Sequence, residues 1–203
     1  MHQKQEIQLN NIMPTTEYIS ISSLSTTGAV SGDVITFNSA TNMWTASALP
    51  TPEVGLIIGT IQHGSNQRTL IFNNIPSKTK RVSVMFDQLY KNGSSPILIQ
   101  IGSGIVIKNY GYHSTSLAAA RIVRESSSTT GFILGGNIGP MSGLFTLTTL
   151  KENKWAAAGT FASSIMTGVA GSVTLQDSLN CLQITTVNGW DTFTSGSVNI
   201  AWE

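Results

Sequence analysis

The chain has 203 residues, of which 10% are charged and 40% hydrophobic, and its 11 basic and 10 acidic side chains leave a net charge of +1. This balance predicts no nucleic acid partner, and the lack of a long apolar run predicts no membrane insertion. The single cysteine, Cys181, excludes an internal disulfide framework and a cysteine-based zinc site, so we expect it to be a core residue.

Residues 1–54 differ from the rest of the chain. Their apolar residues come in isolated pairs, too few to close a core, so this segment needs a partner. Within it, residues 34–45 predict a small hairpin, and Pro50 and Pro52 mark a linker because prolines interrupt both helices and strand ladders. We therefore expect a mostly β or extended shaft segment over 1–54 and a separate domain over 55–203.

Short stretches with the two-residue alternation of half-buried strands recur from residue 55 onward. They are predicted at residues 56–61, 69–72, 81–86, 97–101, 105–107, 118–123, 131–134, 144–150, 155–161, 171–175, 182–186 and 198–202. Trp155 and Trp202 occupy alternating positions and are expected in the core, and Asn188-Gly189 predicts a tight hairpin turn between the last two strands. Without crossover helices the sheets must be antiparallel, so we predict an all-β fold, an antiparallel β-sandwich that is jelly-roll-like.

Two parts of the chain resemble bacteriophage fibre proteins. Residues 30–50, VSGDVITFNSATNMWTASALP, are similar to the G-D-V-L-T-Y-N-S-x-T-x-x-W modules of tail fibres and similar virion appendages. KRVSVMF, NGSSPILIQIGSG, SSSTTGFIL, SGLFTLTTL and LQITTVNGWDTFTSGSVNIAWE are similar, in this order, to a domain at the C-terminus of many phage and prophage tail-fibre proteins. The resemblance spans about residues 59–203. It implies a homotrimeric virion fibre whose C-terminal sandwich meets the host surface, and it identifies no catalytic or sugar-binding residue.

The sequence carries no recognisable catalytic or metal-binding pattern. Its histidines, His2, His63 and His113, lack metal-ligand spacing, and GxSxG does not occur. Acidic residues of the main domain are few and scattered, which leaves a polysaccharide-cleaving appendage as the least favoured alternative. We predict that the protein is not an enzyme and uses neither a metal nor a cofactor.

Two aromatic clusters fit carbohydrate recognition, which needs aromatic faces beside polar groups that bind hydroxyls. One cluster gathers two tyrosines and a histidine after a strand, and the other places a tryptophan and an aspartate at the tight turn. The predicted receptor-binding residues are Tyr110, Tyr112, His113, Trp190 and Asp191. If the chain is extended, the two tyrosines share one face. The alternatives are that the tyrosines pack across strands and that Trp190 is buried in a subunit interface.

These observations predict a tail fibre or other receptor-binding protein that adheres non-covalently to a glycan or protein of the bacterial surface. A homotrimer would bury the isolated apolar pairs of residues 1–54 around its axis and gain avidity, and this segment would bind other virion proteins. The alternative from another class is a structural virion component, such as a head fibre or baseplate decoration. The start of the chain lacks the pattern of a signal peptide, so we expect synthesis in the host cytoplasm and residence in the virion.

Overall fold

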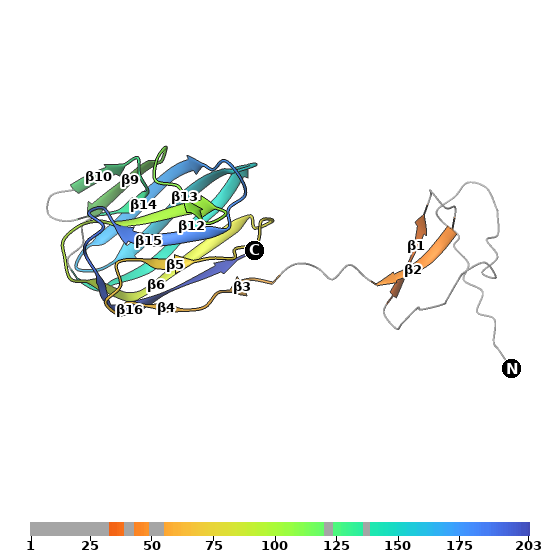
Figure 1. Cartoon of the computed structure of the whole chain (residues 1–203), viewed down its shortest axis with the longest axis horizontal. Coiled ribbons are helices and arrows are strands. Elements are labelled where there is room, and N and C mark those ends of the chain that lie inside the picture. Colours follow the sequence, from red (N-terminus) through yellow and green to blue (C-terminus); the bar gives the residue numbers. More distant parts are fainter. Residues whose placement is uncertain (1–32, 39–42, 49–54, 120–123, 136–138) are drawn as a thin grey trace. The chain divides into compact units, whose positions relative to one another are not determined.

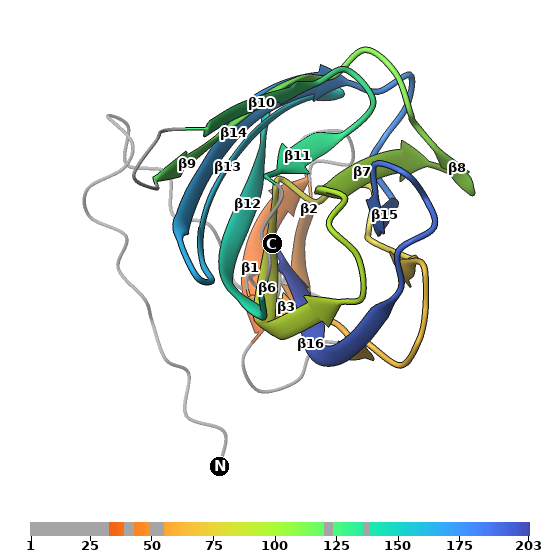
Figure 2. The ribbon, with the colours of Figure 1, turned by 90° about the vertical axis from the view of Figure 1, so that its left-hand side faces the viewer.

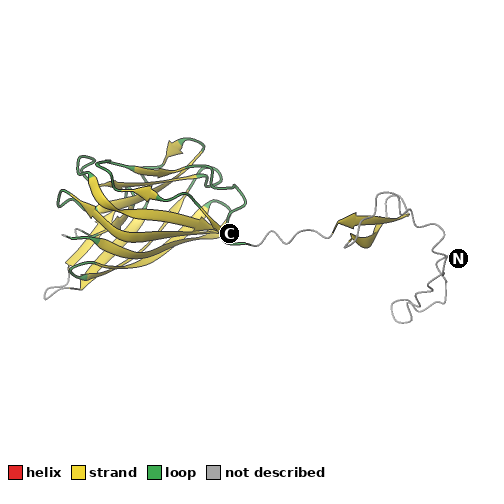
Figure 3. Cartoon of the chain, turned by 90° about the horizontal axis from the view of Figure 1, so that it is seen from below, coloured by secondary structure: helices red, strands yellow, loops and turns green. Residues whose placement is uncertain are grey.

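The computed structural model describes residues 33–38, 43–48, 55–119, 124–135 and 139–203. Every regular element in these ranges is a β-strand (Figure 3), so no helix found there is long and apolar enough to cross a membrane. The chain divides into two compact units, Met1–Glu53 and Val54–Glu203, and each is described by itself.

The first unit contains a two-stranded sheet. Its strands, β1 (Asp33–Asn38) and β2 (Met43–Ala48), pair antiparallel with Phe37 opposite Trp44. The predicted hairpin is therefore confirmed. The remainder of the predicted shaft segment, including residues 1–32 and the proline linker, lies outside the described residues.

The second unit is an antiparallel sandwich of two sheets, as predicted (Figure 1). The larger sheet has the order β10, β9, β14, β13, β12, β6, β16, β3, with β4 also paired to β16. Its strands are β3 (Ile57–Ile58), β4 (Gln62–His63), β6 (Arg81–Lys91), β9 (His113–Ala119), β10 (Arg124–Ser128), β12 (Met141–Lys151), β13 (Lys154–Ala162), β14 (Met166–Thr174) and β16 (Phe193–Trp202).

The smaller sheet has the order β11, β7, β15, β5, with β8 also paired to β7. Its strands are β5 (Leu70–Phe72), β7 (Ile97–Ser103), β8 (Val106–Ile107), β11 (Phe132–Leu134) and β15 (Cys181–Thr186). Figure 2 shows this sheet as a separate layer beside the curved larger sheet.

The core lies between the inner faces of the two sheets. Val82, Val84 and Phe86 alternate inward along β6, as the sequence predicts, and meet aliphatic side chains of β7 and β15 in one buried cluster. Trp155 and Cys181 are buried, which confirms their predicted place in the core. Trp202 is only partly buried and packs against this cluster.

Two buried serines of β9 join the sheets. Ser114 Oγ accepts a hydrogen bond from the backbone N–H of Ile133 at 3.0 Å, and Ser116 Oγ accepts one from Gly135 at 3.1 Å. These N–H groups belong to β11 and the residue after it, at the edge of the smaller sheet, where no further strand pairs with them. The hydroxyls therefore satisfy backbone donors that burial would otherwise leave without partners.

The predicted hairpin at Asn188-Gly189 is wrong. β15 belongs to the smaller sheet, where it pairs with β7 and β5, whereas β16 belongs to the larger sheet and pairs with β6. Residues 187–192 therefore pass from one sheet to the other. A two-residue Asn-Gly sequence favours positive φ, but it does not decide which strands its flanks pair with.

Candidate functional site

The loop of residues 187–192 carries two of the predicted receptor-binding residues, Trp190 and Asp191, at one end of the sandwich. The backbone N–H of Gly189 donates to the carbonyl of Thr186 at 3.0 Å, and Gly189 has a φ of +68°. A glycine adopts this left-handed conformation without the steric cost that a side chain would add. The chain thus turns sharply between the sheets just before Trp190.

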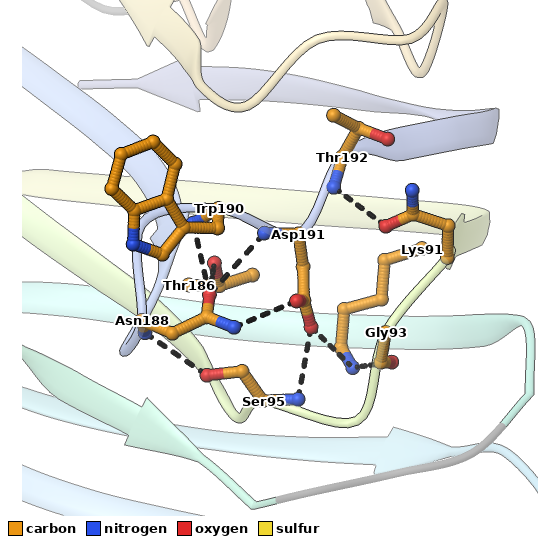
Figure 4. A network of polar contacts seen from close by, with 9 residues as sticks. Lys91, Gly93, Ser95, Thr186, Asn188, Trp190, Asp191 and Thr192 are labelled. Carbon is orange, nitrogen blue, oxygen red and sulfur yellow. Dashed lines mark hydrogen bonds and ion pairs between the residues drawn. The ribbon is translucent and has the colours of Figure 1, made fainter.

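The side chain of Asn188 organises this loop (Figure 4). Its Oδ1 accepts hydrogen bonds from the backbone N–H groups of Trp190 at 3.0 Å and Asp191 at 3.2 Å, and from Thr186 Oγ1 at 2.9 Å. Its Nδ2 donates to Asp191 Oδ1 at 2.7 Å. Asparagine side chains readily form such local bonds to the backbone N–H two residues later. The loop is therefore held in place by its own side chains.

Asp191 joins the loop to the segment that follows β6. Its Oδ2 accepts a hydrogen bond from the backbone N–H of Ser95 at 2.9 Å and lies 3.8 Å from Nζ of Lys91. In return, the backbone N–H of Asn188 donates to Ser95 Oγ at 3.0 Å. A Cβ at Gly93 would overlap this carboxylate, so any larger residue there would displace the side chain of Asp191. Both carboxylate oxygens of Asp191 thus bind within the protein, and we assign Asp191 a positioning role.

Burial and charge act in opposite directions on the ion pair of this loop. The side chains of Lys91 and Asp191 are only 5% and 12% exposed. The hydrogen bond from Asn188 lowers the pKa of Asp191 most; burial raises it, and the Ser95 N–H and the Lys91 charge lower it further. Burial lowers the pKa of Lys91, which the charge of Asp191 partly offsets. The positive charge of Lys91, at the end of β6, and the negative charge of Asp191, in the loop, therefore balance each other.

Trp190 is the residue that this network presents to solvent. It is 69% exposed, and the guanidinium Cζ of Arg68 lies 5.0 Å from the centroid of its ring. Beside it, the backbone N–H of Thr192 donates to Asn92 Oδ1 at 2.9 Å, which ties the far end of the loop to the same neighbouring segment. An indole on a fixed backbone can pack against the apolar face of a sugar ring or a protein side chain.

A cleft lies next to this loop. Its volume is about 380 Å³, and it is lined by Tyr90, Lys91, Asn92, Gly93, Ser94 and Gly139. The lining combines a tyrosine with asparagine, serine and backbone polar groups, which suits a hydroxylated ligand. Because the Lys91 ammonium pairs with Asp191, the cleft and the Trp190 loop share one supporting network.

The other predicted cluster is arranged differently. Tyr112 is fully buried, with its ring centroid 5.0 Å from that of Phe132 in an edge-to-face contact. Its hydroxyl accepts a hydrogen bond from the backbone N–H of Ile101 at 2.8 Å and donates to the carbonyl of Lys108 at 3.0 Å. Burial raises the pKa of Tyr112. The prediction of Tyr112 as a receptor-binding residue is therefore wrong, because the alternation of β9 turns it into the core.

Tyr110 and His113 remain at the surface. Tyr110 is 57% exposed, and Nζ of Lys108 lies 3.9 Å from the centroid of its ring. His113 begins β9 and is exposed. Tyr110 and Tyr112 do not share an exposed face, so the cluster predicted from the sequence is not assembled.

The two aromatic segments lie apart. Val187 N–H donates to the carbonyl of Pro96, just before β7, whereas Tyr112 binds Ile101 further along that strand. Five residues of β7 separate these points, which is about 16 Å. Tyr110 and Trp190 are thus candidates for different surfaces, and they do not form one site.

Sequence reasoning missed three residues of the Trp190 site: Arg68, Lys91 and Ser95. Ser95 and Asp191 are 96 positions apart, and no local pattern in the sequence links two such positions. The pairing of β6 with β16 and of β7 with β15 brings these segments together.

The described residues include no cluster of metal-binding side chains. Within those ranges, no group of three or more histidine, cysteine, aspartate or glutamate side chains could hold a metal ion. Comparisons with protein-family models, curated proteins and solved structures find no match to this chain. The function must therefore be argued from the residues themselves.

Proposed function

We propose that this protein is a receptor-binding protein of a bacteriophage virion, such as a tail fibre, which adheres non-covalently to a glycan or protein of the host surface through the Trp190 loop. The observation that carries the proposal is a tryptophan 69% exposed on a loop whose backbone is fixed by hydrogen bonds. Rigid, exposed aromatic side chains bind partners with little loss of conformational entropy, which is why binding surfaces use them.

The position of Trp190 within the sandwich supports this proposal. The chain enters this unit next to β3, where Ile57 pairs with Trp202 at the end of β16. Trp190 precedes the opposite end of β16, and this strand of 10 residues spans about 33 Å. The loop therefore lies at the end of β16 far from β3, the first strand of this unit, which supports a role as a receptor-contacting tip.

A homotrimer is part of the proposal, and a row of small and apolar side chains on the outer face of the larger sheet supports it. Leu117, Gly168, Thr160 and Leu144 follow one another across β9, β14, β13 and β12 on the outer face. Leu117 and Leu144 are exposed, as is Met166 on the adjacent row. Small and apolar side chains on this face suit packing against another copy, and three linked tips would gain avidity.

Binding of labelled protein to a panel of candidate host cells, beside a light-scattering mass, tests this proposal. We expect saturable binding by a species of three chains and its loss in Trp190→Ala. Tyr110→Ala is the matched control, because it removes another exposed aromatic ring beneath a cation, and it should bind as the wild type does. Loss of binding in Tyr110→Ala but not in Trp190→Ala would place the receptor on the other surface and contradict the proposal.

The apolar row on the outer face also favours a second candidate, a structural virion component whose sandwich only packs against other subunits. A trimer that binds no cell of a broad host panel would support this alternative. Release of reducing sugar from host polysaccharide would instead indicate the polysaccharide-cleaving alternative.

A further inference from the structure

We infer that the ligand of the Trp190 loop is an acidic glycan, whose carboxylate is bound by Arg68 while its sugar ring packs on Trp190. This inference rests on the proposed function and adds the chemical class of the receptor. It starts from Arg68, whose guanidinium Cζ lies 5.0 Å from the centroid of an exposed indole. Arg68 and Trp190 are separated by more than a hundred positions, so no local sequence pattern predicts that they are neighbours.

The charge of Arg68 has no counter-charge in the described part of the chain. The ion pairs found there join Arg81 to Glu203, Lys91 to Asp191 and Lys151 to Glu152. Arg68 is exposed, and its only contact of this kind is with the ring of Trp190. An arginine of this sort can accept an anionic partner without first breaking a salt bridge.

The charge of Asp191 in the loop is cancelled by that of Lys91 at the end of β6. Asp191 is the acidic residue closest in sequence to Trp190, and its carboxylate is held inside the loop by Ser95, Asn188 and Lys91. The buried pair of Lys91 and Asp191 adds no net charge to the surface. The exposed part of this site therefore carries the positive charge of Arg68, which attracts a carboxylate.

The backbone that carries Arg68 is fixed beside the loop. Gln67 and Phe193 exchange two backbone hydrogen bonds, of 3.3 Å and 2.7 Å, and Thr185 Oγ1 donates to the carbonyl of Arg68 at 3.4 Å. These contacts connect Arg68 to the residues on both sides of the Trp190 loop. The position of its guanidinium over the ring thus follows from the fold as well as from the attraction between cation and aromatic face.

The geometry of the pair leaves both groups able to bind a ligand. Arg68 is exposed, and the N–H donors of its guanidinium can bind a carboxylate through two parallel hydrogen bonds. The indole, 69% exposed, still offers apolar surface to the C–H face of a sugar. Together they match a sugar that carries a carboxylate, such as a uronic acid or a keto-sugar acid.

The test uses surface polysaccharide extracted from a host strain that the full-length wild-type protein binds, before and after chemical reduction of its carboxyl groups to alcohols. Arg68→Gln removes the charge and keeps much of the stem, and we expect it to weaken binding about tenfold or more. Arg68→Lys keeps the charge but loses the paired hydrogen bonds, so its affinity should be intermediate. Carboxyl reduction should weaken the wild type by a similar factor and Arg68→Gln no further.

Lys108→Gln is the matched control, because it removes the cation that lies over Tyr110, and it should leave the affinity unchanged. Thermal unfolding of each variant checks that the exposed substitutions leave the fold intact. Wild-type binding that survives carboxyl reduction, or equal binding by Arg68→Gln, overturns the inference but leaves the proposed adhesion standing. A wild type that binds the intact cells but no polysaccharide extracted from them, in either form, also overturns the inference and leaves the proposed adhesion standing.

Discussion

The two aromatic segments of the sandwich, residues 110–113 and 188–191, look alike in sequence but behave differently in the fold. Each places a large ring among glycine and polar residues after a strand. In the first, β9 continues from His113, and its alternation turns Tyr112 toward the opposite sheet. In the second, the chain crosses between sheets, and Asn188 holds a turn that leaves Trp190 outside. Whether an aromatic ring is buried or exposed thus depends on whether the residues next to it join a sheet.

The polar groups of the two segments also form different kinds of hydrogen bond. The hydroxyl of Tyr112 binds the backbone at Ile101 and Lys108 and closes one end of the core. The carboxylate of Asp191 and the amide of Asn188 bind each other, and Asp191 also binds Ser95, so they support a ring that is 69% exposed. One segment therefore stabilises the sandwich, whereas the other builds a surface.

Tyr112→Ala should show the largest effect on stability. Removal of a buried aromatic ring costs about 3–5 kcal/mol, through lost burial and the cavity that remains. Tyr112→Phe keeps the ring but leaves the Ile101 N–H and the Lys108 carbonyl without this partner, at a cost of about 1–3 kcal/mol. Urea unfolding of both variants measures these costs. Stability equal to that of the wild type in Tyr112→Ala would mean that this ring is not part of the core.

Asp191→Asn should cause the next largest loss of unfolding free energy, about 3 kcal/mol near pH 7. It leaves the buried Lys91 without its counter-charge and removes one hydrogen-bond acceptor. Since folding lowers the pKa of Asp191, its contribution is present above the ordinary aspartate pKa of about 3.9 and is lost as the pH falls through the lower folded value. The difference in unfolding free energy between the wild type and Asp191→Asn should therefore shrink below about pH 4.

Glu152→Gln is the control for this pH dependence. Its ion pair with Lys151 spans 4.0 Å between two side chains that are both exposed, so solvent screens the attraction. Urea midpoints measured between pH 3 and pH 7 should show no comparable gap for this variant. A gap of the same size would mean that the pH response reflects the net charge of the protein rather than the buried pair.

The same comparison indicates what the sequence could predict. Alternation of Val82, Val84 and Phe86 predicts β6 and its inner face correctly, because period two follows directly from strand geometry. It fails at Tyr112, since the inward row of β9 continues with Ser114 and Ser116, whose polar side chains conceal the burial. The serines are inside because they bind the edge of β11, a requirement that only the packed sheets reveal.

The Trp190 site was predicted in part. The exposure of its ring follows from a local turn, which the residues of the turn indicate. The partner residues Arg68, Lys91 and Ser95 come from distant segments, and they become neighbours only through the pairing of β6 and β16 and the bridge between Gln67 and Phe193. Local patterns predict which side chain is exposed, whereas long-range pairing decides what stands next to it.

Trp190→Ala and Tyr110→Ala should have the smallest effect on the stability of the fold. Each removes an exposed ring and one cation–aromatic contact, worth about 0.5–1 kcal/mol at exposed sites. The midpoint temperature of thermal unfolding of a domain this size should therefore fall by no more than about 2–4 °C in either variant. A much larger loss for Trp190→Ala, increasing as the protein is diluted, would show that its ring is buried between subunits. In that case the exposed face of the single chain would be an assembly surface, and receptor binding would have to be sought near Tyr110.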